Sequence, residues 1–184
     1  MFLVTIAIAL LPFVVCETDP TKVCLPDTIQ FNVLNLATEE IGVWAIDFNK
    51  QLYGQIFPNQ SFVHDLKAAK AYNTDASGNC RSSILPPEGV HPQCFRSVSK
   101  RMGEGYIGLG PNRIPFEAWE FPYSRGVAKL TYTNQPDEPR GPAVVKFIDE
   151  KGVITYTFFF NPSLNITSPT IFNIPDPCPP ETAL

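Results

Sequence analysis

The stretch AVVKFIDEKGVITYTFFF, residues 143–160, places the strongest constraint on the fold of this chain. It consists of two runs rich in β-branched and aromatic residues, separated by the turn-forming segment Asp149–Gly152. Such residues favour extended backbone, and a short gap that contains glycine favours a hairpin. We therefore expect two antiparallel strands here, joined by a tight turn.

The same alternation of apolar and polar residues recurs elsewhere. In TIQFNVLN, residues 28–35, Ile29, Phe31 and Val33 occupy one face and polar residues the other. The segment 61–72, SFVHDLKAAKAY, fits either a strand or a short helix, and we favour the strand. Further strands are expected over 42–48, 52–57, 114–121 and 127–133, with a hairpin at 49–50 and an irregular loop over 84–94.

Many short strands without intervening helices indicate an antiparallel, mainly β fold, which is a sandwich or an open barrel. The first residues, MFLVTIAIALLPFVVCETDP, are apolar from Phe2 to Val15 and carry no charge before Glu17. That length fits a secretory signal and falls short of a membrane span; the alternative is a buried element of the mature fold. We interpret 1–16 as a signal peptide and 17–184 as one secreted domain with no transmembrane segment.

Four cysteines remain after that cleavage, namely Cys24, Cys80, Cys94 and Cys178. An even number in an exported chain predicts two disulfides, and four cysteines allow three pairings. The rival interpretation, a zinc site, would use close pairs such as C-x-x-C, and the sequence has none. The glycosylation sequons at Asn59 and Asn165 agree with a secreted glycoprotein.

Several classes of function are disfavoured. A net charge of −4, with no basic cluster longer than SKR at 99–101, argues against nucleic acid as a partner. The chain has two histidines, His64 and His91, and no G-x-S-x-G motif, so we expect no enzymatic activity and interpret both as structural. The glycines of GEGYIGLG, residues 103–110, lack the Lys-Ser/Thr of a phosphate loop and are typical of strands and turns.

Calcium is the one cofactor for which the sequence offers candidate ligands. Carboxylates occur at Asp75, at Asp137 and Glu138, and at Asp149 and Glu150. No D-x-D-x-D-G loop is present, and the last two pairs are also explained as loop and hairpin-turn residues. A calcium site would therefore have to be assembled from residues that are distant in the sequence.

Aromatic residues are concentrated in the expected strands. Composition alone favours a core role for them, and the alternative is a pocket for an apolar ligand between two splayed sheets. The residues that we assign to such a hydrophobic cavity are Phe31, Trp44, Phe48, Phe116, Trp119, Tyr132, Phe147, Tyr156 and Phe158.

Several short motifs follow one another along the chain. They are VCLPDTIQF, GNCRSSIL with HPQC after it, GYIGLG, FEAWEF and NITSPTIFNIPDPC. Their order, and the closing pattern of Pro169, Phe172, Pro175 and Cys178, resembles the ependymin family over nearly the whole mature chain.

The resemblance implies a secreted, disulfide-bonded glycoprotein of two stacked antiparallel sheets, similar to bacterial lipoprotein carriers, with a hydrophobic cavity between them. It also implies that Cys80 bonds with Cys178. Cys24 matches the family's first cysteine, but its usual partner is missing near 144–147, and we expect Cys94 to take that place. Asn165 lies close to where relatives carry a glycan, whereas Asn59 has no such support.

Two functions of different classes follow from these features. The leading hypothesis is a non-catalytic binding protein that holds a lipid or other apolar molecule between its sheets. The alternative, which the resemblance also implies, is a calcium-dependent protein of the extracellular matrix and cell adhesion with a filled core. Some family members are associated with lysosomes and some form dimers, so lysosomal targeting and a homodimer stay open.

Overall fold

The structure is a computed structural model that describes residues 19–123, 126–133 and 139–180. The expected signal peptide over 1–16 and the candidate calcium ligands Asp137 and Glu138 lie outside the described residues. Within the described ranges, no helix has the length and apolar character that crossing a membrane requires.

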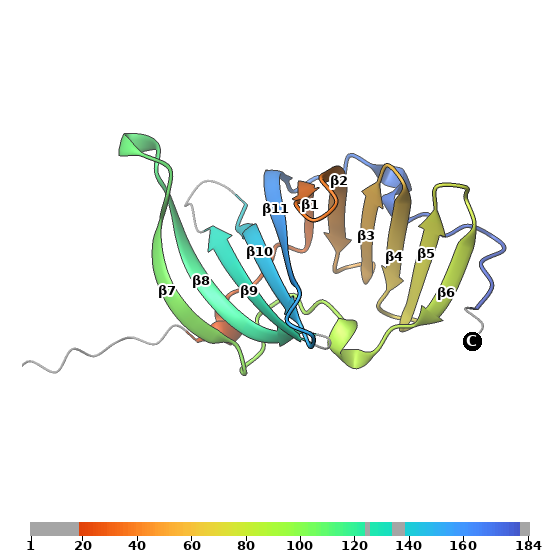
Figure 1. Ribbon diagram of the computed structural model, residues 1–184, viewed down its shortest axis with the longest axis horizontal. Helices are drawn as coiled ribbons and strands as arrows, with labels where there is room; N and C mark the ends of the chain where they lie inside the picture. The colour runs from red at the N-terminus through yellow and green to blue at the C-terminus, as the bar shows by residue number, and fades with distance from the viewer. Residues whose placement is uncertain (1–18, 124–125, 134–138, 181–184) are drawn as a thin grey trace, which may run out of the picture.

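In these ranges the chain forms eleven strands of one antiparallel sheet, in the order β6-β5-β4-β3-β2-β1-β11-β10-β9-β8-β7 (Figure 1). The strands are β1 Thr28–Asn35, β2 Glu40–Asp47, β3 Leu52–Phe57, β4 Gln60–Asp65, β5 Lys70–Asp75, β6 Cys80–Ile84, β7 Lys100–Ile107, β8 Ile114–Tyr123, β9 Gly126–Thr133, β10 Gly141–Asp149 and β11 Ile154–Ser163. Short 3-10 helices are η1 Pro20–Lys22, η2 Pro87–Gly89, η3 Gly110–Asn112 and η4 Pro169–Phe172.

The mainly β, antiparallel prediction is confirmed. The hairpin expected over 143–160 is β10 and β11, and its turn is closed by Asp149, whose carboxylate accepts hydrogen bonds from the backbone N–H groups of Lys151 and Val153. The segment 61–72 contains no helix, but it is not one strand: 61–65 belong to β4, 66–69 form a turn, and 70–72 begin β5. Strand β6 is not among the expected strands.

The described residues form one continuous sheet and not the expected pair of stacked sheets. Hydrogen bonds between β1 and β11 join the two halves, so the described residues contain one sheet and no second sheet stacked on it. Figure 1 shows that β7–β9 are inclined relative to β2–β6, because the sheet twists and curves along its length. The sheet is not closed into a barrel, since β6 and β7 are its two edges.

The connection from β6 to β7 has to pass from one edge of the sheet to the other (Figure 1). We call residues 85–99 the crossing segment. The face of the sheet on which this segment packs is called the inner face. Phe95 of this segment contacts Trp119, with ring centroids 5.2 Å apart, and Tyr132, at 5.6 Å. The Cys24–Cys94 disulfide ties the segment to the residues that precede β1. The expected pairing of these two cysteines is confirmed.

The opposite, outer face of β2–β4 is covered by residues 164–180, which we call the C-terminal arm. Ile171 in η4 is fully buried, and a Cβ added at Gly54 would collide with its carbonyl oxygen, so only glycine permits this close approach. The Gln30 side chain accepts hydrogen bonds from the backbone N–H groups of Thr167 and Ser168. The arm ends at the Cys80–Cys178 disulfide, which confirms the second expected pairing.

Candidate functional site

The inner face carries two clusters of buried apolar side chains. The first lies on β1–β3 and the second on β8 and β9, and Leu25 packs against both. Their buried members are Ile29, Phe31, Val33, Trp44, Ile46, Tyr53 and Phe57 in the first, and Trp119, Leu130 and Tyr132 in the second. An apolar wall therefore extends over both halves of the sheet.

Six of the nine residues assigned to a cavity belong to this wall or lie beside it. Phe31 and Trp44 are cross-strand partners with ring centroids 5.7 Å apart, and Phe48 packs against their cluster. The other three residues on the inner face are Trp119, Tyr132 and Phe147.

The other three assigned residues, Phe116, Tyr156 and Phe158, lie on the outer face and not on the inner face. Phe116 is three residues from the inward-facing Trp119 in β8, so the two side chains point to opposite faces. In β11 the inward ring is that of Phe159, whose centroid lies 5.6 Å from that of Phe31. Its neighbour Phe158 therefore points to the outer face, where it is 38% exposed, and so does Tyr156. The run of three phenylalanines carries no alternation, so the sequence could not show which ring points inward.

Four rings that the cavity assignment did not include form a stack across the inner face. His91 of the crossing segment lies between Tyr53, at 4.4 Å between ring centroids, and Tyr123, at 5.5 Å. His64 stacks beside both Tyr53, at 4.8 Å, and His91, at 5.9 Å. We call Tyr53, His64, His91 and Tyr123 the histidine stack. It joins β3 and β4 to β8 through the crossing segment.

The histidine stack disfavours positive charge. Burial lowers the pKa of His91 to about 3, and the nearby His64 and Arg96 add to this effect. Burial also lowers the pKa of His64, whose buried Nδ1 atom has no hydrogen-bond partner among the described residues. The Tyr123 hydroxyl and His91 Nε2 are 3.2 Å apart, and burial raises the pKa of Tyr123 to about 12. Both imidazoles are therefore neutral at pH 7.

Mild acid is expected to destabilise the protein through His91. Between about pH 6.5 and 3 the unfolded chain binds a proton at this residue and the folded chain does not, so the free energy of unfolding falls as the pH falls. The loss is about 1.4 kcal/mol per pH unit, or about 2 kcal/mol between pH 7 and pH 5. Urea unfolding at several pH values between pH 7 and pH 5 measures the loss.

The matched variant is His91→Phe, which keeps an aromatic ring in the stack and removes the titrating group. Its stability should vary less between pH 7 and pH 5 than that of the unaltered chain, with a residual slope from His64. Equal slopes for the two proteins would show that His91 does not carry the effect.

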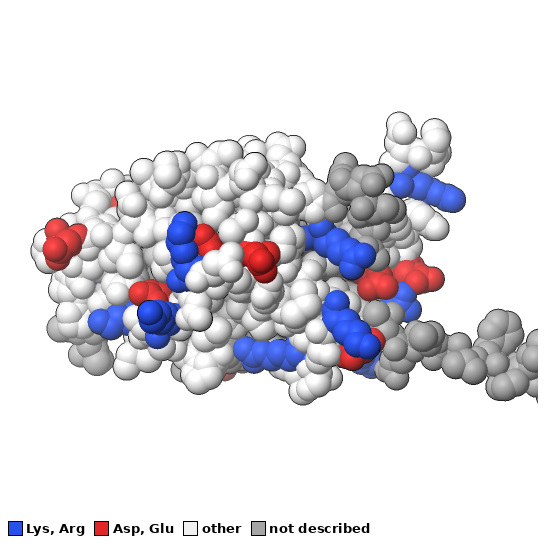
Figure 2. All heavy atoms as spheres, turned by 180° about the vertical axis from the view of Figure 1, so that it is seen from behind, with Lys and Arg blue, Asp and Glu red and all other residues white. Residues whose placement is uncertain are grey.

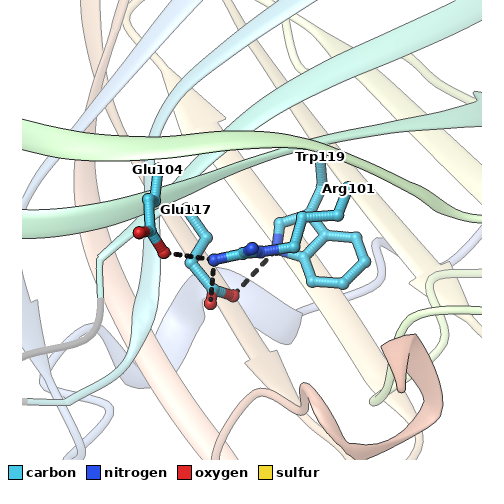
Figure 3. Close-up of polar contacts among 4 residues, drawn as sticks. All are labelled: Arg101, Glu104, Glu117 and Trp119. Carbon is cyan, nitrogen blue, oxygen red and sulfur yellow. Dashed lines mark hydrogen bonds and ion pairs between the residues drawn. The ribbon is translucent and has the colours of Figure 1, made fainter. Parts of the chain in front are cut away.

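A polar network lies beside the second apolar cluster, at the paired strands β7 and β8 (Figure 3). The Arg101 guanidinium donates to the carboxylates of Glu104 and Glu117, the latter at 3.2 Å, and these partners raise the pKa of Arg101. Trp119 Nε1 donates to the other oxygen of Glu117, also at 3.2 Å. Both carboxylates accept hydrogen bonds from the Arg101 guanidinium. The network is therefore better suited to form the polar edge of a binding surface than to transfer protons in catalysis.

The candidate calcium ligands inside the described ranges are committed to turns. Asp75 accepts hydrogen bonds from the backbone N–H groups of Ser77 and Asn79 and from the Asn79 side chain, and these bonds lower its pKa. Asp149 closes the β10–β11 turn, and Glu150 is the next residue of that turn. The described residues contain no group of three or more His, Cys, Asp or Glu side chains placed to hold a metal ion.

A groove of about 440 Å³ lies at the β4–β6 end of the sheet. By strand register, Phe62, Ala71, Asn73, Arg81 and Ser83 line it from the inner face. The lining combines the aromatic rings of Phe62 and Tyr72 with several polar side chains, so this end of the sheet is more polar than the two apolar clusters.

No protein-family model matches this chain, and no curated protein matches it. Among solved structures, the chain is similar to an uncharacterized conserved protein from Thermus thermophilus, with a TM-score of 0.55 and 14% sequence identity. The match covers 84% of this chain and 89% of that chain. At this identity the likeness concerns the fold alone, so the chain shares an open, mainly β fold with the bacterial protein.

Proposed function

We propose that this protein is a secreted, non-catalytic carrier of the ependymin type, which holds a lipid or other apolar molecule on the inner face of its curved sheet. The observation that carries the proposal is the apolar wall, which runs over both halves of an open sheet. In this view β1–β6 and β7–β11 take the part of the two stacked sheets that the resemblance implies, and the ligand lies between them.

The covering of the wall is consistent with this role. Single stretches of chain, the crossing segment and the residues before β1, pack on the inner face in place of a sheet. Displacing such segments exposes less apolar surface than separating two sheets would, because stacked sheets pack through the side chains of two whole faces. An alkyl chain bound there is stabilised by about 0.8 kcal/mol for each buried CH₂ group.

The polar network supplies the selectivity in this proposal. Arg101, Glu104 and Glu117 lie next to Trp119, so an amphipathic ligand could bury its chain in the wall and leave its head group beside them. The exposed side chains of Asn59 and Asn165 fit glycans that keep the outer surface soluble.

Native mass spectrometry of the secreted protein tests the carrier proposal. We expect a stoichiometric mass beyond the chain and its glycans, which disappears on organic extraction and reappears as a defined lipid. The extracted protein should then take up a fluorescent fatty acid. A clean apo mass and no uptake would overturn the proposal and favour the matrix and adhesion alternative, for which a calcium-dependent melting temperature is the next observation.

Two variants of the β10–β11 hairpin localise the ligand. Phe147→Glu places a charge on the inner face, and Phe158→Glu places the same charge on the outer face of the same hairpin. Uptake should fall about tenfold or more in the first variant and stay unchanged in the second, because burying a charge against an alkyl chain is unfavourable. Equal uptake by both variants would place the ligand elsewhere. Circular dichroism checks that both fold.

A further inference from the structure

The hairpin of β7 and β8 ends in a projection that the carrier proposal does not use. Residues 106–113, which we call the hairpin tip, stand clear of the remainder of the sheet in Figure 1. Gly108 and Gly110 have φ values of +94° and +65°, a backbone region that favours glycine, and η3 follows directly. The turn therefore presents Leu109, which lies between these glycines, at the end of the hairpin.

The hairpin tip is apolar at the position where turns normally carry polar residues. Leu109 is 93% exposed, the largest exposed fraction among the large hydrophobic side chains in the described ranges. Tyr106 and Ile107 beside it are 58% and 37% exposed. One exposed leucine is common on protein surfaces, but here three exposed apolar side chains lie within four residues of one another at the end of a projecting hairpin.

The charge of the hairpin tip favours a negatively charged partner. The chain has a net charge of −4, yet the tip itself, residues 106–113, contains one arginine, Arg113, and no Asp or Glu. The Arg113 guanidinium lies over the Tyr106 ring, 4.2 Å from its centroid. In Figure 2 the projection at the upper right shows basic and uncharged atoms and no acidic ones on the visible side.

We propose that the hairpin tip docks this protein on the surface of a lipid bilayer that contains anionic lipids. Leu109 and Ile107 enter the boundary between head groups and acyl chains. Tyr106 lies at head-group level, where tyrosine is enriched in membrane proteins, and Arg113 pairs with anionic head groups. Because the tip projects beyond the sheet, these side chains reach a flat surface before the acidic residues of the body do.

The docking is weak and reversible, since it uses two aliphatic side chains and one cation. It is also independent of the carrier proposal, because no residue of the hairpin tip belongs to the apolar wall. A chain with a filled interior would dock equally well, and a carrier without docking would still take up ligand from solution.

Flotation with vesicles tests the docking. The full secreted chain is mixed with vesicles of phosphatidylcholine, or of phosphatidylcholine and phosphatidylserine, and the floated fraction is measured at low and high salt. We expect binding to the mixed vesicles that decreases in high salt, and about tenfold less binding for Leu109→Asp. Arg113→Gln should remove the preference for phosphatidylserine.

The matched control is Ile84→Asp, because Ile84 is 85% exposed on β6, far along the sheet from the hairpin tip. This variant should float as the unaltered chain does. Absence of flotation for the unaltered chain, or equal flotation of Leu109→Asp, would overturn the proposal and leave the tip as a contact for another protein. Equal binding to both kinds of vesicle would overturn the role of Arg113. Fatty acid uptake, measured in the same variants, should not change.

Discussion

Replacing Cys178 with alanine is expected to lower the free energy of unfolding by about 4–5 kcal/mol. The Cys80–Cys178 bond joins residues 98 positions apart, and in the chain-entropy model a crosslink of this length strongly restricts the unfolded chain. Urea unfolding of the oxidised protein at pH 7, with and without the substitution, measures the difference. The double variant Cys80→Ala/Cys178→Ala is the control, and it should lose no more than this, because either substitution already removes the bond.

The same substitution should release only the last part of the C-terminal arm. The beginning of the arm keeps the hydrogen bonds to Gln30 and the buried side chain of Ile171. Beyond η4, Ser82 donates from its backbone N–H to the carbonyl of Pro179 and from its hydroxyl to the carbonyl of Cys178. Two hydrogen bonds from one residue are too few to hold the chain end without the disulfide. Limited proteolysis should therefore cut the variant after Phe172 and leave Ile171 protected. Cleavage before η4 would contradict this account of how the arm is held.

Much of the local structure could be predicted from the sequence, because alternation is a local property. The hairpins β2–β3 and β10–β11 combine β-branched or aromatic runs with turn residues, and both form as expected. Strand β6 has the sequence CRSSI, which lacks alternation and β-branched residues until its last position. It is extended because it pairs with β5 and holds the end of the C-terminal arm, and both contacts are tertiary.

The arrangement of the strands could not be derived in this way. One sheet forms, in place of two, because β1 pairs with β11, more than a hundred residues away. The histidine stack depends on the same kind of information. His64 and His91 meet because β6 and β7 are the two edges of the sheet, which makes the crossing segment traverse the inner face. No spacing of the two histidines in the sequence indicates that contact.

The aromatic residues show the limit of sequence patterns, because the packing of the strands decides which face each ring occupies. The sequence supports a list of strand aromatics, but a shift of one residue in register moves a side chain to the other face. Trp119 and Tyr156 were assigned to the same cavity, and the structure places the first on the inner face and the second on the outer face. Trp119 is 1% exposed and Tyr156 is 38% exposed, so their contributions to stability should differ widely.

Trp119→Ala is expected to lower the free energy of unfolding by about 3–5 kcal/mol in the lipid-free protein, whereas Tyr156→Ala should lower it by less than about 1.5 kcal/mol. The tryptophan ring packs against Phe95, so its loss leaves a cavity beneath the crossing segment. It also removes the donor to Glu117, which keeps its bond to Arg101. Urea unfolding after organic extraction measures both values, and the extraction matters because a bound ligand would stabilise the folded state.

The result also separates two roles for the wall. A loss near the upper value would mean that Trp119 is packed by the protein's own side chains, and that a ligand must displace Phe95 and the crossing segment to reach it. A loss below about 1.5 kcal/mol would mean that the ring borders open space in the lipid-free protein, because a side chain without packing partners contributes little. In that case Trp119→Ala should weaken fatty acid uptake more than it weakens the fold. Measuring both quantities on one variant therefore shows whether the inner face is a core that opens or a pocket that is already formed.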